Sequence, residues 1–112
     1  MSMTESIRRI IYLGSIDPMP LDNLGLKLGA EAGELSEAIN YQQGYLPHKQ
    51  MKEPLSGEVA DVINTAIAVL VRAYPDKSSE EVFDMLVAEL ERKSDKWEAA
   101  ISSVPGNKQN IK

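Results

Sequence analysis

The amino-acid sequence predicts an all-α fold built from four helices in one domain. Apolar residues recur every three or four positions along four segments, and we find no useful run of the strict alternation that is typical of strands. Proline or glycine interrupts the chain between segments. A chain of 112 residues has the length of one domain, which we place at residues 1–102. The polar tail at 103–112 is expected to be disordered.

The first helix is expected to run from about Thr4 to Leu13, with Thr4 as its N-cap. Residues 17–20 contain two prolines and should end it, because the residue before a proline disfavours helical geometry. The apolar face of this helix is formed by three isoleucines: Ile7, Ile10 and Ile11.

The second helix is expected from Leu21 or Asp22 to Gln43, with one acidic residue, Glu31, inside its apolar stripe. The other members of that stripe are Leu24, Leu28, Leu35, Ala38 and Ile39. The opposite side carries small residues: Gly25, Gly29, Gly33 and Ser36. Because a glycine inside a helix costs up to about 1 kcal/mol relative to alanine, this face predicts the close approach of a helix or a ligand, or else local flexibility.

The last two helices have clear stop and start signals. The third should run from near Ser56 to Tyr74, where Pro75 stops it. Ser78 or Ser79 should cap the fourth helix, which is expected to continue to about Ser102.

The third helix is almost wholly apolar from Val59 to Val71, which predicts that it is buried nearly all round. Three polar residues nevertheless stand at three-residue intervals on one side of it: Glu58, Asp61 and Asn64. A buried carboxylate is unfavourable unless it is neutralised, paired or bound to a metal ion. Other acidic residues, among them Glu53 and Glu89, are expected to lie on solvated faces.

Composition excludes several classes of function. The formal net charge of −5 argues against a nucleic-acid polymer as partner. The absence of cysteine excludes disulfides and thiolate metal sites. No apolar run approaches the length needed to span a membrane, and no secretory signal is visible. We therefore expect a soluble, cytoplasmic protein without a membrane partner.

Two acidic pairs carry the chemistry. Glu31 with Glu34, and Glu58 with Asp61, are each spaced three residues apart, which places both carboxylates of a pair on one helix face. Two such helices packed antiparallel can bring four carboxylates together. Hard oxygen ligands suit Mg²⁺ or Mn²⁺. The sole histidine, His48, lies in a loop and is not three residues from a helical glutamate, which disfavours iron and zinc.

These motifs resemble those of the MazG-type all-α nucleoside triphosphate pyrophosphohydrolases. The matching segments are 26–28 leading into 31–35 (EAGEL) and then 58–62 (EVADV), in the family order E-x-x-E, a variable stretch, and E-x-x-D. The resemblance covers about residues 20–100. It implies a four-helix bundle that assembles as a homodimer or a dimer of dimers. It also implies Mg²⁺, for which Mn²⁺ could substitute, held by Glu31, Glu34, Glu58 and Asp61.

The implied reaction converts a ribo- or deoxyribonucleoside triphosphate and water into a nucleoside monophosphate and pyrophosphate, by attack at the α-phosphorus. Many relatives carry a second glutamate just before the first motif position, whereas this chain has Ala30. Glu34 and Glu37 are our candidate catalytic carboxylates. With Ala30 in place, either Glu37 or a metal-bound hydroxide would serve to activate the attacking water.

Substrate contacts are assigned to the third and fourth helices. Lys93 and Lys96 are candidates for binding the triphosphate, although either could be a surface lysine whose stem covers apolar residues. Asn64 could contact a phosphate or hold a metal through water. Trp97 could stack on the base or pack in the core or a dimer interface. Weaker candidates for a cationic contact are Lys27, Arg72 and His48.

Two rival functions stay open. The chain could be a catalytically silent helical dimer that acts as a partner-binding or regulatory module, which Ala30 would favour. It could also hydrolyse another phosphate ester, such as a nucleoside diphosphate or a phosphoribosyl compound. The preferred base and sugar do not follow from the residues.

Overall fold

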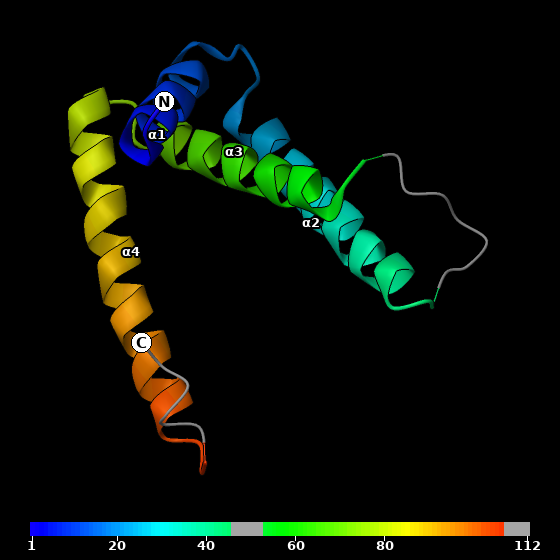
Figure 1. Cartoon of the computed structure of the whole chain (residues 1–112). Coiled ribbons are helices and arrows are strands. Elements are labelled where there is room, and N and C mark those ends of the chain that lie inside the picture. Colours follow the sequence, from blue (N-terminus) through cyan, green and yellow to red (C-terminus); the bar gives the residue numbers. More distant parts are fainter. Residues whose placement is uncertain (46–52, 107–112) are drawn as a thin grey trace.

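The structure is a computed structural model that describes residues 1–45 and 53–106. Within these ranges the chain forms four α-helices and no strand, which confirms the predicted all-α class (Figure 1). The helices are α1 (Met3–Ile16), α2 (Leu21–Gln42), α3 (Leu55–Ala73) and α4 (Ser79–Ser102). The expected boundaries agree with the observed ones to within one or two residues, except that α1 continues to Ile16, beyond the expected Leu13.

Helix α1 begins at a capping box that includes Ser2, so the expectation that Thr4 is the N-cap is wrong. The Ser2 hydroxyl accepts a hydrogen bond from the Glu5 amide at 3.1 Å, and the Glu5 carboxylate accepts one from the Ser2 amide at 3.2 Å. This reciprocal pair satisfies two amide donors at once, which Thr4 could not do without a partner three residues on. Ser78 and Glu81 form the same box at the start of α4.

Helices α2 and α3 run antiparallel side by side. Helix α1 crosses α3 near the C-terminal end of α3 (Figure 1). Gly14 makes that crossing close. A Cβ added to Gly14 would lie 3.0 Å from the Ala68 Cα and 3.4 Å from its Cβ. The absence of a side chain at Gly14 therefore lets the two helix backbones approach each other.

The apolar core lies where α1, α3 and α4 meet. Four buried residues form it: Ile11, Ile67, Val71 and Val82. On the surface beside this core, the Arg8 guanidinium of α1 lies 4.1 Å from the centre of the Phe83 ring and pairs with the Glu80 carboxylate. The core and this surface contact together hold the first half of α4 against α1.

One face of α3 and the second half of α4 are exposed, so the expectation that α3 is buried nearly all round is wrong for the single chain. Val59 is 39% exposed and Ile63 is 48% exposed. The first half of α4 contacts α1, and its second half extends away from α2 (Figure 1). Trp97 lies on this second half and is 69% exposed. The sequence pattern shows that the exposed face of α3 is apolar, but it does not show what covers that face.

No helix in the described part of the chain is both long enough and apolar enough to cross a membrane. Two predictions fall on residues outside the described ranges. These are the loop position of His48 and the disorder of the tail beyond Gly106.

Replacing Gly14 by alanine should destabilise the fold, because the new methyl group would press against the backbone of Ala68. We expect a loss of about 1 kcal/mol or more in the free energy of unfolding, even after the gain in helix propensity. Gly25→Ala is the matched control, since nothing lies within 4 Å of a Cβ there. Urea denaturation followed by circular dichroism measures both variants. A Gly14→Ala protein as stable as the control would contradict the close crossing.

Candidate functional site

The two acidic pairs lie on the facing sides of α2 and α3. On α2, Glu31 is half-buried and Glu34, one turn further on, is exposed. On α3, Glu58 and Asp61 are both half-buried in the N-terminal half of the helix. Because the helices run antiparallel and pack extensively on each other, the side chains from separate parts of the sequence meet in one cluster.

The carboxylates form two overlapping sets. Oxygen atoms of Glu31, Glu34 and Glu58 all lie within 4.8 Å of one another, and so do oxygen atoms of Glu53, Glu58 and Asp61. Glu58 belongs to both sets. The four residues picked out by the sequence are therefore brought together across the α2–α3 contact, and a fifth carboxylate, that of Glu53, joins them.

Two carboxylate oxygens in this cluster are buried without a donor. Oε2 of Glu31 and Oε2 of Glu58 have no hydrogen-bond partner among the described residues. Burial, followed by the charges of Glu34 and Asp61, raises the pKa of Glu31 above its ordinary value, while the nearby Lys27 acts in the opposite direction. A site with negative charge and unsatisfied acceptor atoms favours a proton or a cation.

Glu53 is the site residue that sequence reasoning missed. It was expected on a solvated face, and it is indeed exposed; it lies outside any helix, just before the Pro54 N-cap of α3. Its carboxylate nevertheless turns toward the first turns of α3, where burial and the neighbouring Glu58 raise its pKa. No helical periodicity extends to such a position, so the pattern that found the other four acids could not find this one.

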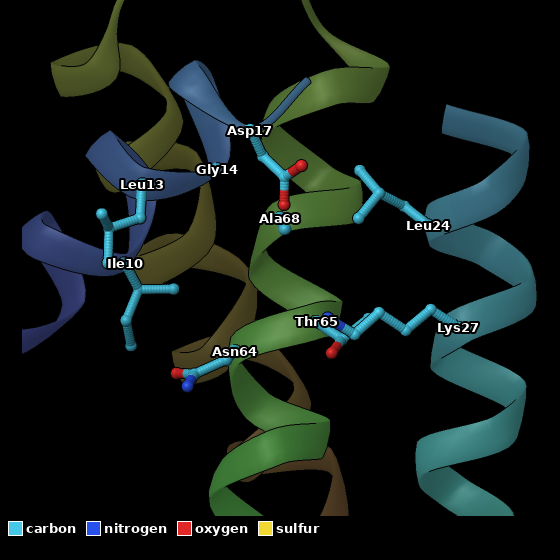
Figure 2. A pocket seen from close by; sticks show the side chains of 9 residues that line it. All are labelled: Ile10, Leu13, Gly14, Asp17, Leu24, Lys27, Asn64, Thr65 and Ala68. Carbon is cyan, nitrogen blue, oxygen red and sulfur yellow. The ribbon is translucent and has the colours of Figure 1, made fainter. Parts of the chain in front are cut away.

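A cavity of about 150 Å³ lies beside the cluster, between α1, α2 and α3 (Figure 2). Apolar side chains form one part of its wall: Ile10, Leu13, Leu24 and Ala68. Polar residues and Gly14 form the rest, the polar residues being Asp17, Lys27, Asn64 and Thr65. Figure 2 shows Lys27 reaching from α2 toward Thr65 on α3. The cavity adjoins the acids, since Lys27 is one turn from Glu31 and Thr65 one turn from Asp61.

Some of the remaining predicted site residues lie near the acidic cluster, and others lie far from it. Asn64 lines the cavity, and Glu37 is half-buried on α2. Lys93, Lys96 and Trp97 are exposed on the second half of α4, which points away from the cluster within one chain (Figure 1). Their assignment as substrate contacts stays a prediction. Lys27, a weaker candidate from the sequence, lies close enough to Glu31 to affect its pKa.

The glycine face of α2 meets nothing within the described chain. A Cβ at Gly25, Gly29 or Gly33 would have no heavy atom of another element within 4 Å. The close approach predicted from these glycines is therefore not made by the described residues of the same chain.

No protein-family model, curated protein or solved structure matches this chain at a significant level. Five carboxylates and no described cysteine or histidine ligand make an all-oxygen donor set, which could hold a hard divalent cation.

The metal-free protein should lose thermal stability as the pH rises from mildly acidic to neutral. The pKa values of Glu31 and Glu53 are raised in the folded state above the ordinary 4.5. The folded protein then binds protons more tightly than the unfolded chain does. The stability gained from protonating these two carboxyl groups is therefore fully present below their ordinary pKa, and it is lost as the pH rises through their raised pKa values.

Glu80 and Glu81 should make the folded protein less stable at low pH. Their pKa values are lowered, Glu80 by its hydrogen bond with Arg8 and Glu81 by its hydrogen bonds with Ser78. The stability they contribute is present above the ordinary 4.5 and is lost as pH falls below it. Melting temperatures measured in chelator across this range should show a maximum under mildly acidic conditions. A melting temperature that is highest at neutral pH would contradict the repulsion inferred for the cluster.

Proposed function

We propose that this chain is a Mg²⁺-dependent nucleoside triphosphate pyrophosphohydrolase, as its resemblance to the MazG-type enzymes implies. One observation carries the proposal: Glu31, Glu34, Glu58 and Asp61, the residues of the E-x-x-E and E-x-x-D motifs, converge from two helices into one cluster. A structural role for the acids alone would leave them repelling one another with no described cation in an ion pair with them.

A divalent cation fits this cluster. The buried Oε2 atoms of Glu31 and Glu58 lack a donor among the described residues, and a buried acceptor without a donor is unfavourable. An ion coordinated by oxygen would satisfy both atoms and offset the charge. When bound, Mg²⁺ would offset the negative charge of the phosphates and lower the pKa of a water molecule for attack on phosphorus.

The neighbouring cavity could bind the nucleoside part of the substrate. Its apolar wall could receive a ring of the nucleoside, since a cavity of about 150 Å³ holds one six-membered ring. The Asn64 amide offers both a donor and an acceptor to polar ring atoms. Lys27, which lines the cavity and interacts with Glu31, provides a positive charge toward the phosphates.

The candidate for activating water is Glu37. It follows Glu34 by three residues on α2, so both lie on neighbouring turns of one face, and it is half-buried. With alanine at position 30, Glu37 is the next carboxylate along α2 that could accept a proton from a water molecule near the cluster.

We further propose that the working unit is a homodimer or a larger homo-oligomer. The exposed apolar residues Val59 and Ile63 on α3 need a cover, and a second copy would provide one. The same assembly could bring Lys93, Lys96 and Trp97 of one chain to the acids of another. Sedimentation velocity at micromolar concentration should show a dimer or tetramer. A stable monomer would oppose this part of the proposal.

The rival function, a silent partner-binding module, is favoured by the same exposed apolar surface. The hydrolase and the silent module differ in whether the acidic cluster must bind a cation. A module needs no divalent cation and no turnover, whereas the hydrolase needs both. Activity measurements therefore separate them where oligomeric state does not.

The protein should release pyrophosphate from at least one nucleoside triphosphate when Mg²⁺ is present. A panel of ribo- and deoxyribonucleoside triphosphates, with products separated by chromatography, tests this directly. Asp61→Asn should lower turnover by about a hundredfold or more, because it weakens a group expected to hold the cation.

Glu91→Gln, which removes one exposed charge on α4, is the matched control and should retain normal turnover. A nucleoside diphosphate as the first product would exclude attack at the α-phosphorus. Unchanged turnover in Asp61→Asn would remove this residue from the site.

A further inference from the structure

We propose that Glu53 is a fifth carboxylate of the metal centre, and that Gly57 is the residue that makes room for it. This inference rests on the proposed function only in taking the acidic cluster to be a divalent-cation site. Neither residue belongs to the E-x-x-E or E-x-x-D motif. Glu53 would hold a cation jointly with Glu58 and Asp61, on the side of the cluster nearest the start of α3.

The first support is the geometry of the carboxylates. Oxygen atoms of Glu53, Glu58 and Asp61 lie within 4.8 Å of one another, the same limit that holds for Glu31, Glu34 and Glu58. Ionised carboxylates only accept hydrogen bonds, so they cannot bond to each other directly. Carboxylates at this separation repel one another, and a proton or a cation would offset their charge. Glu58 also carries a buried Oε2 with no described partner.

The second support is the space at Gly57. A Cβ added there would lie 3.1 Å from the Glu53 Cδ and 3.3 Å from each of its two carboxylate oxygens. Carbon atoms normally keep about 3.5–4.0 Å apart. The Glu53 carboxylate therefore lies against a backbone position that has no side chain, and a Cβ at position 57 would require it to shift by a few tenths of an ångström.

Glycine at position 57 has no obvious benefit for the helix itself. Gly57 lies in the first turn of α3, where its φ angle is not in the left-handed region. Alanine would favour the helix more than glycine does. Room for the carboxylate is a reason for glycine that helix formation does not supply.

The geometry also defines what Glu53 would do. Glu58 is shared between the two sets, so the set formed with Glu53 is a second group of three carboxylates next to the first. The second set would offer Glu53, Glu58 and Asp61 as oxygen ligands to a cation. Removing Glu53 should therefore weaken one class of cation site and leave the Glu31–Glu34 side intact.

Mn²⁺ binding to the nucleotide-free protein, followed by electron paramagnetic resonance, tests the role of Glu53 without any enzymatic readout. Glu53→Gln keeps the size of the side chain and removes its charge. We expect it to weaken Mn²⁺ binding about tenfold or more in at least one class of sites. Glu91→Gln changes the net charge equally from an exposed position on α4 and should bind Mn²⁺ as the unmodified protein does.

Gly57→Ala tests the positioning role. It should leave the melting temperature in chelator unchanged or higher, because alanine favours the helix, yet weaken Mn²⁺ binding to a similar extent as Glu53→Gln. The double variant should bind Mn²⁺ little worse than either single variant, because both changes act on one carboxylate. Gly25→Ala, a helical glycine with open space around it, should not alter Mn²⁺ binding.

The outcomes separate this inference from the proposed function. If the unmodified protein binds Mn²⁺ and both Glu53→Gln and Gly57→Ala bind it equally well, Glu53 is not a ligand, while the four-carboxylate centre stands. If Gly57→Ala alone has no effect, the positioning role is overturned. If the unmodified protein binds no Mn²⁺ at all, the metal centre itself fails, and the inference fails with it.

Discussion

Repulsion among carboxylates at the contact between α2 and α3 is the constraint on which the rest of the molecule depends. Packing two helices normally buries apolar side chains, but here the same contact gathers Glu31, Glu34, Glu58 and Asp61, with Glu53 added from outside the helices. Two oxygen atoms of the cluster are buried without a described donor. Such an arrangement lowers the stability of the folded chain, and it persists only where something else holds the helices in place.

The core at the other end of α3 provides that support. Ile11, Val71 and Val82 join α1, α3 and α4 there, and the close crossing at Gly14 fixes α1 against α3. The acids lie toward the opposite end of α3, so stability and the candidate chemistry are separated along one helix. The cavity lined by Lys27 and Asn64 lies between these two regions, where α1 closes one side of the α2–α3 pair (Figure 2). This is where a ligand could contact both the rigid core and the charged cluster.

Much of this arrangement is predictable from the sequence. Helical periodicity located all four helices, and three-residue spacing on successive helices identified four of the five clustered acids. Two features needed the structure for physical reasons. Glu53 precedes its helix, so its position depends on the path of the chain before Pro54 and on the space at Gly57, neither of which follows a period. The exposure of Val59 and Ile63 depends on which helices cover α3, and an apolar pattern cannot distinguish a face buried within one chain from a face that meets another.

The most direct test of the account is the melting temperature of the unmodified protein and of Asp61→Asn, each measured in chelator and in saturating Mg²⁺. If the carboxylates repel one another and a cation relieves them, Asp61→Asn should melt at a higher temperature than the unmodified protein in chelator. It should also gain less from Mg²⁺, because it binds the ion more weakly. A variant that melts lower in chelator and gains as much from Mg²⁺ as the unmodified protein would show that Asp61 is a structural residue, and would contradict the metal centre.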